Sequence, residues 1–110
     1  MLSVILKRFE EPDETRVFEN GRFEVVHIGG LTIGRATYEP GWKWSIHVAP
    51  VAGTSLCPVE HVGLVTPGNL FYIPPTPHDS WVVGTERYVS LHFLGAEHYS
   101  ASPRGRSGSA

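Results

Sequence analysis

The chain has 110 residues and a formal net charge of −2, which allows one domain with one modest core. Its nine basic residues are dispersed along the sequence, which excludes nucleic acid as the main partner because phosphate binding needs a concentrated basic face. The single cysteine, Cys57, excludes an internal disulfide and suits a reducing compartment.

Short β-type segments follow one another from the N-terminus, separated by turn residues, and this pattern predicts an all-β domain. The apolar stretch before Lys7 is too short for a signal peptide or a membrane span, so we expect a cytoplasmic protein with no membrane partner. The predicted strands span residues 3–9, 22–28, 31–38, 42–48, 61–65, 70–73, 80–83 and 88–94. We predict a single β-barrel domain over residues 1–95 and a short turn with a disordered polar tail over residues 96–110.

The turns between the predicted strands are marked by glycine, proline and acidic residues. Asn20-Gly21 is a strong turn signal because both residues tolerate positive φ, and an acidic turn is expected over residues 10–14. Only residues 66–69 separate two of the strands, with Pro67 and Gly68 at the positions that favour a type II turn. These two strands are therefore predicted to form a direct hairpin.

Six histidines and one cysteine are the residues with metal-ligand chemistry. The histidines are His27, His47, His61, His78, His92 and His98. Three of them, His47, His61 and His78, lie where a predicted strand meets a loop. Imidazole and thiolate are ligands that zinc, iron and copper prefer. Each histidine taken singly is more often a buried ring bonded to backbone, and His27 and His98 keep that interpretation.

The strand over residues 61–65 places its ligand candidates on one face. A period of two puts His61, Gly63 and Val65 together, away from Glu60. Cys57 lies four residues before His61 and reaches it if the intervening loop folds back. Gly63 has no side chain and would leave room beside a bound ion or a small ligand.

The segments EPGWKWSIHV, HVGLV, GNLFYIPPTPHDSW and YVSLHFLG, in this order, resemble the cupin superfamily of small jelly-roll barrels. Pro40-Gly41, five residues and then His47 match the start of the first cupin motif. Gly68, five residues, Pro74 and then His78 match the second motif with a spacing one residue short. The resemblance covers residues 3–95 and implies a single-domain jelly-roll that binds one divalent transition metal and commonly dimerises.

The chain also departs from the cupin pattern at its ligand positions. Ala49 stands in the place of the second histidine of the first motif, and His61 stands where the motif has its glutamate. Cys57 precedes His61 by the usual three-residue gap and could replace the lost histidine. The resemblance therefore implies a metal site formed by His47, Cys57, His61 and His78, holding zinc, iron or copper.

A larger departure is the lack of the edge hairpin that separates the two motifs in ordinary cupins. Its loss exposes apolar surface and a sheet edge, which proteins usually cover. A second subunit could supply the cover, the N-terminal strand could shift over it, or the chain could be a marginally stable shortened variant. Of these we expect a homodimer.

Three functions are compatible with these residues. The first is a metal-binding cupin that acts on or binds a small organic molecule, where three protein ligands would leave a position open for the substrate and four would close it. The second is a non-catalytic small-molecule-binding or regulatory module, and the third is a degenerate β-domain without metal. The aromatic residues that could line a ligand pocket are Trp42, Trp44, Phe71, Tyr72 and Trp81.

Other polar residues have both a functional and a structural interpretation. Asp79, next to His78, either orients that ring or is an exposed turn residue. Arg35, Lys43 and Arg87 either recognise a carboxylate or are surface charges. His92, on the last predicted strand, either points outward or is hydrogen-bonded inside the barrel.

Overall fold

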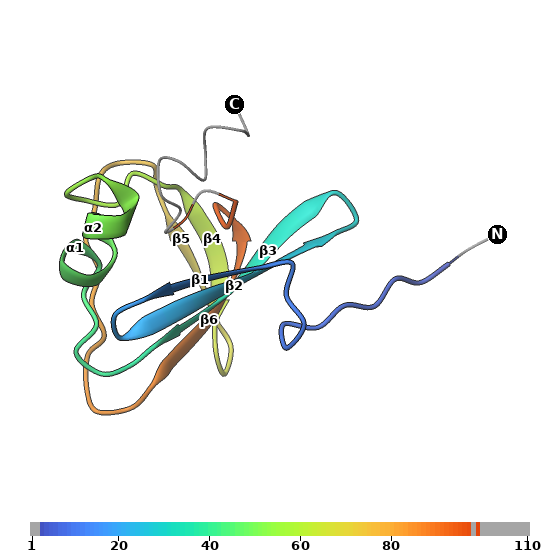
Figure 1. Cartoon of the computed structure of the whole chain (residues 1–110), viewed down its shortest axis with the longest axis horizontal. Coiled ribbons are helices and arrows are strands. Elements are labelled where there is room, and N and C mark those ends of the chain that lie inside the picture. Colours follow the sequence, from blue (N-terminus) through green and yellow to red (C-terminus); the bar gives the residue numbers. More distant parts are fainter. Residues whose placement is uncertain (1–2, 98, 100–110) are drawn as a thin grey trace.

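The computed structural model describes residues 3–97 and 99, and in these residues six strands form one antiparallel sheet. The order across the sheet is β1-β2-β3-β6-β4-β5 (Figure 1). The elements in chain order are β1 (Glu14–Phe18), β2 (Gly21–Ile28), β3 (Leu31–Tyr38), α1 (Trp44–His47), α2 (Ala49–Ala52), β4 (His61–Val65), β5 (Asn69–Ile73) and β6 (Tyr88–Leu94). The all-β prediction is confirmed. The described strands form this one sheet and do not close into a barrel.

The predicted hairpin of β4 with β5 is confirmed, and β2 and β3 form a second hairpin. The β2–β3 hairpin turns at Gly29-Gly30, and the β4–β5 hairpin pairs His61 with Ile73 and Val65 with Asn69. Asn20 has a φ of 64° at the turn before β2, as its sequence context predicts. The prediction of a type II turn between β4 and β5 is wrong. Gly68 would be the third residue of that turn, which requires a positive φ, and its φ is not positive.

Three of the predicted strands were wrong. Residues 3–9 form no strand and extend away from the sheet (Figure 1), and β1 instead lies over residues 14–18. Residues 44–47 form helix α1 in place of the strand expected over residues 42–48. Residues 80–83 contribute only a single bridge, between Trp81 and Lys43. The predicted tail lies almost wholly outside the described residues.

The core lies between the inner face of the sheet and the two short helices, which sit at one end of the sheet (Figure 1). Phe23 and Val25 of β2 face this core beside Ala36 of β3. Trp44 of α1 packs into the same core and is fully buried. One face of the sheet is therefore covered by residues that follow β3 in the chain.

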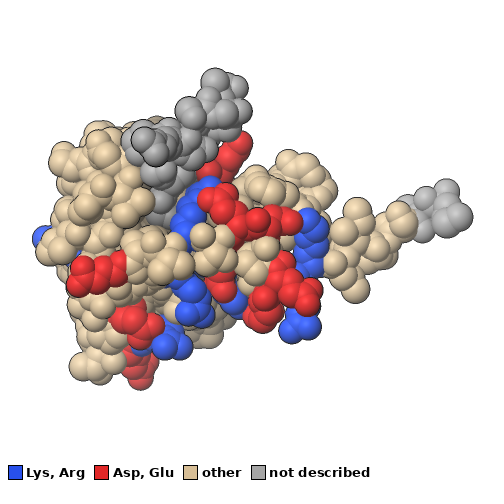
Figure 2. All heavy atoms as spheres, in the orientation of Figure 1, with Lys and Arg blue, Asp and Glu red and all other residues tan. Residues whose placement is uncertain are grey.

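The outer face of the sheet is divided into a charged half and an apolar half. Over β2 and β3, Arg35 pairs with Glu24 and Glu10. Figure 2 shows charges of both signs interspersed near β1 and the N-terminal segment. Six apolar residues of β4, β5 and β6, which we call the outer patch, share the other half: Val62, Leu64, Leu70, Tyr72, Leu91 and Leu94. None of the helices in the described residues has the length and apolar character needed to cross a membrane.

Candidate metal centre

Three of the predicted ligands meet at one end of β4. Donor atoms of Cys57, His61 and His78 all lie within 4.8 Å of one another. Cys57 and His61 are buried and His78 is half-buried, and the Cys57 Sγ atom lies 3.5 Å from His61 Nε2. The three residues come from the loop before β4, from the first residue of β4 and from the loop after β5.

Backbone hydrogen bonds hold two of these ligands together across the two loops. The Cys57 N–H donates to the His78 carbonyl at 2.7 Å, and the His78 N–H donates to the Cys57 carbonyl at 2.9 Å. His61 is placed by the β4–β5 hairpin, in which it pairs with Ile73. The short turn between β4 and β5 thus brings the two loops, and with them the ligands, to one end of the same hairpin.

The ring of His78 is oriented as a metal ligand would need. Its Nδ1 lies 2.9 Å from the Thr76 carbonyl oxygen, which can only accept a hydrogen bond, so Nδ1 carries the proton. Nε2 of His78 then keeps its lone pair for an ion. A backbone carbonyl that fixes the tautomer in this way commonly accompanies metal-binding histidines.

Burial controls the protonation of the other two ligands. It raises the pKa of the Cys57 thiol to about 11. Burial, and to a smaller extent the charge that His78 carries when it is protonated, lowers the pKa of His61 to about 4, so the His61 ring is neutral at pH 7 and keeps a lone pair. A metal ion would therefore have to displace the thiol proton, but no proton from His61.

The ring nitrogens of His61 lack good hydrogen-bond partners within the described residues. Its Nε2 has only the thiol of Cys57 as a neighbour, which is a weak hydrogen-bond partner, and its Nδ1 has no partner among the described residues. Buried polar atoms of this kind usually have a partner, because leaving them unpaired costs free energy. A metal bond to Nε2 would replace the weak contact with the Cys57 thiol, which gives the burial of this nitrogen a physical reason.

His47 is not brought to this group. Because residues 44–47 turn into α1, its Nδ1 accepts a hydrogen bond from the Lys43 N–H at 2.9 Å. Its Nε2 lies 3.5 Å from the side-chain nitrogen of Asn20. The predicted four-residue set therefore reduces to three in the described structure, and the reason is the helix that replaces the expected strand.

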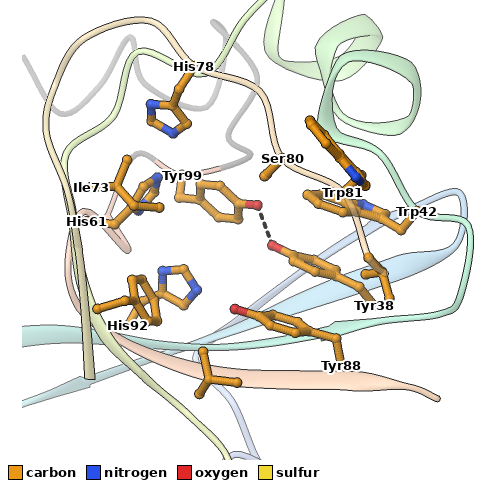
Figure 3. Close-up of a pocket in the computed structure, with 13 residues that line it drawn as sticks. Tyr38, Trp42, His61, Ile73, His78, Ser80, Trp81, Tyr88, His92 and Tyr99 are labelled. Carbon is orange, nitrogen blue, oxygen red and sulfur yellow. Dashed lines mark hydrogen bonds between the residues drawn. The ribbon is translucent and has the colours of Figure 1, made fainter. Parts of the chain in front are cut away.

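A cavity of about 250 Å³ adjoins the three ligands and is lined by His61 and His78 (Figure 3). Trp42, Phe71 and Trp81 line it, as their sequence positions suggested. The two other expected aromatic residues lie elsewhere, since Trp44 is in the core and Tyr72 points outward to Glu60. Three tyrosines that the sequence analysis did not consider also line the cavity: Tyr38, Tyr88 and Tyr99.

His92 lies inside the domain beside the cavity, with its Nε2 3.0 Å from Ser90 Oγ. It pairs with Gly34 on one side and Gly63 on the other. The missing side chains make room for the rings of Phe23 and Phe71, whose centres lie 5.2 Å and 5.5 Å from that of His92. Gly63 thus leaves space for the ring of Phe71, whereas the sequence predicted room beside a bound ion or a small ligand.

The charged residues near the site have structural contacts. Asp79 accepts hydrogen bonds from the N–H and hydroxyl of Ser45, at 3.0 Å and 2.7 Å, and so holds the start of α1. Burial alone would raise the pKa of Asp79, but these bonds and one from Ser80 lower it. Arg35 and Arg87 pair with glutamates, and Lys43 lies over the ring of Trp81, so none of the three lines the cavity.

Comparison with known proteins gives no relative: no family model, no curated protein and no solved structure matches this chain.

Proposed function

We propose that the protein is a cupin-type domain that binds one transition-metal ion through Cys57, His61 and His78 and a small organic molecule in the adjoining cavity. The observation that carries the proposal is the convergence of one thiol and two imidazoles from three chain segments. Thiolate and imidazole together favour zinc, iron or copper over magnesium or manganese.

The distance between two of the donors fits such an ion. Zinc binds sulfur at about 2.3 Å and nitrogen at about 2.0–2.1 Å, which in a tetrahedral site sets the two ligand atoms about 3.5 Å apart. Cys57 Sγ and His61 Nε2 are separated by 3.5 Å. The backbone bonds between Cys57 and His78 support the third ligand in the same place.

Three protein ligands would leave a coordination position for water or for an organic ligand. A bound ion of this kind supplies Lewis acidity. His61 and His78 both line the cavity, which supports the organic molecule as the occupant of that position. His92, whose pKa burial lowers to about 3, is neutral and lies beside it as a hydrogen-bonding group.

A second candidate is binding without catalysis. Among the described residues that line the cavity there is no carboxylate and no lysine, so the acid–base groups available there are imidazoles and phenols. Turnover assays with oxygen and without it would separate this candidate from an enzyme.

The experiment that tests the metal site is elemental analysis after zinc loading and desalting. We expect about one zinc per chain in the parent and strongly reduced zinc in Cys57→Ser and His78→Ala. His47→Ala is the matched control and should retain the parent content, because His47 faces Asn20 and the Lys43 backbone. A cobalt-loaded parent should show thiolate-to-metal charge-transfer absorption that Cys57→Ser lacks.

Two results would contradict the proposed site. One is a parent that retains no zinc, iron or copper after reconstitution. The other is loss of the metal in His47→Ala to the same extent as in His78→Ala. Circular dichroism of each variant separates loss of the site from loss of the fold.

A further inference from the structure

We infer that the cavity beside the three ligands takes an uncharged aromatic molecule of one or two rings that carries a hydroxyl group. This inference rests on the proposed function for the location of the site. It adds the chemical class of the ligand, which it derives from the walls of the cavity.

The size of the cavity sets the first limit. Its volume of about 250 Å³ lies just below the range of roughly 300–1,000 Å³ that ligand pockets usually have. A ligand enclosed there is therefore small. One ring or two fused rings fit this limit, whereas a nucleotide or an oligosaccharide does not.

The charge of the walls sets the second limit. None of the described residues that line the cavity is Lys, Arg, Asp or Glu. An ionised group that leaves water without a partner of opposite charge loses far more free energy than a neutral one. Carboxylates and phosphates are thus disfavoured in the protein without metal, because no lysine or arginine is among the described residues that line the cavity.

The walls also favour a flat ring. Tyr38 stacks on Trp42 with ring centres 3.8 Å apart and planes 2° apart, and Tyr88 is nearly parallel to Tyr38 at 5.6 Å. Figure 3 shows the hydroxyl ends of both tyrosines pointing toward the side of the cavity formed by His61 and His92. The edges of this stack carry the positive part of the ring quadrupole, which attracts the face of another aromatic ring.

Polar atoms at the walls can bind one hydroxyl of the ligand. Tyr88 and Ser80 bring hydroxyl groups to the cavity, and His78 brings the imidazole whose Nε2 keeps its lone pair. These groups donate or accept single hydrogen bonds and carry no fixed charge. A phenol-type ligand matches this combination of an aromatic wall and a few neutral polar atoms.

Calorimetric titration of the metal-free, full-length protein with three probes built on the same fused two-ring skeleton tests the inference. The probes are 2-naphthol, its carboxylate counterpart 2-naphthoate, and the saturated alcohol decahydro-2-naphthol. We expect saturable one-to-one binding of 2-naphthol. We expect 2-naphthoate to bind at least about tenfold more weakly, and the saturated alcohol roughly threefold to tenfold more weakly.

Two matched variants on β4 locate the binding. Val65 lines the cavity, whereas Val62 lies on the opposite face of the same strand in the outer patch. Val65→Trp should therefore weaken 2-naphthol binding at least about tenfold, and Val62→Trp should change it less than about twofold. Equal or tighter binding of 2-naphthoate, or unchanged binding in Val65→Trp, would overturn the inference.

The failure of this inference and that of the proposed metal site are distinguishable. If the protein retains zinc but binds no 2-naphthol, the proposed metal site stands and the proposed ligand class is refuted. If the protein binds 2-naphthol but retains no metal, the proposed ligand class stands and the proposed metal site is refuted.

Discussion

His61 and His92 are two buried imidazoles whose ring centres lie 5.3 Å apart, and burial is the largest cause of the low pKa of each. No carboxylate belongs to the donor group that His61 forms with Cys57 and His78, and none is among the described residues that line the cavity with His92. Both rings are therefore held neutral by desolvation of their charged form. The same neutrality that keeps their lone pairs available makes the fold sensitive to acid.

The free energy of unfolding of the metal-free protein should fall as the pH is lowered. A histidine in the unfolded chain binds its proton near pH 6.5, whereas folded His61 and His92 stay neutral down to about 4 and about 3. The unfolded state then binds more protons below pH 6.5, so each ring lowers stability by at most about 1.4 kcal/mol per pH unit, and the loss ends once pH passes the folded pKa. Urea unfolding between pH 7.5 and 4.5 measures this slope.

The matched comparison for this slope is His92→Gln, which keeps a polar side chain beside Ser90 without a titrating ring. Its unfolding free energy should fall less steeply with decreasing pH than that of the parent. Identical slopes in the two proteins would show that His92 is not a buried neutral histidine in solution.

Residues of the candidate site could be predicted from the sequence only where their spacing along the chain, or the resemblance to the two cupin motifs, pointed to them. Cys57 and His61 are four residues apart, and His78 follows the hairpin, so these three positions were identified without the structure. The sequence predicted His47 as a fourth ligand because residues 42–48 were expected to form a strand, whereas residues 44–47 form helix α1. Tyr38 and Tyr88 could not be assigned to the cavity from the sequence, since they are brought together by the pairing of β3 with β6.

Strand β4 depends on a glycine at the position where β6 and β5 both approach it. A Cβ atom added to Gly63 would collide with the Leu91 carbonyl and with the ring of Phe71. Backbone cannot move aside as a flexible side chain can, so the collision would distort the pairing of β4 with β6. The glycine is therefore required by packing at the centre of the sheet.

Gly63→Ala should lower the free energy of unfolding by about 1–3 kcal/mol or more. The control is Gly68→Ala in the neighbouring turn, where nothing lies within 4 Å of an added Cβ and φ is not positive. That variant should stay within about 1 kcal/mol of the parent. Equal destabilisation of the two variants in urea unfolding would contradict the packing of Gly63 described above.

The strands were predictable where the hydrophobic pattern and the turn signals agreed locally. The hairpins β2–β3 and β4–β5 and the strand β6 are of this kind. Helix α1 was missed because a contact distant in sequence fixes it: Asp79 accepts the hydrogen bond from the Ser45 N–H. Strand β1 was missed because its residues are mostly polar, and its pairing with β2 creates it.

The two edges of the sheet differ in how they are protected. The edge strand β1 carries Glu14 and Arg16, charged residues of the kind that discourage pairing with another chain. The edge strand β5 carries no charged residue, and it borders the outer patch. Residues 3–13 of the N-terminal segment do not pair with this edge, so in the described part of the chain the N-terminal segment does not provide the cover that was one of the three possibilities.

We propose that a second copy of the chain covers β5 and the outer patch, so the parent should be dimeric in sedimentation velocity. Leu70, 79% exposed on β5, is the test position, and Leu70→Lys should shift the protein toward the monomer because a charge on an edge strand opposes pairing. Leu31, 60% exposed at the start of β3, gives the control Leu31→Lys, which should sediment as the parent does. A parent that stays monomeric across the accessible concentration range would refute this interface. Dissociation in both variants would place the interface elsewhere on the molecule.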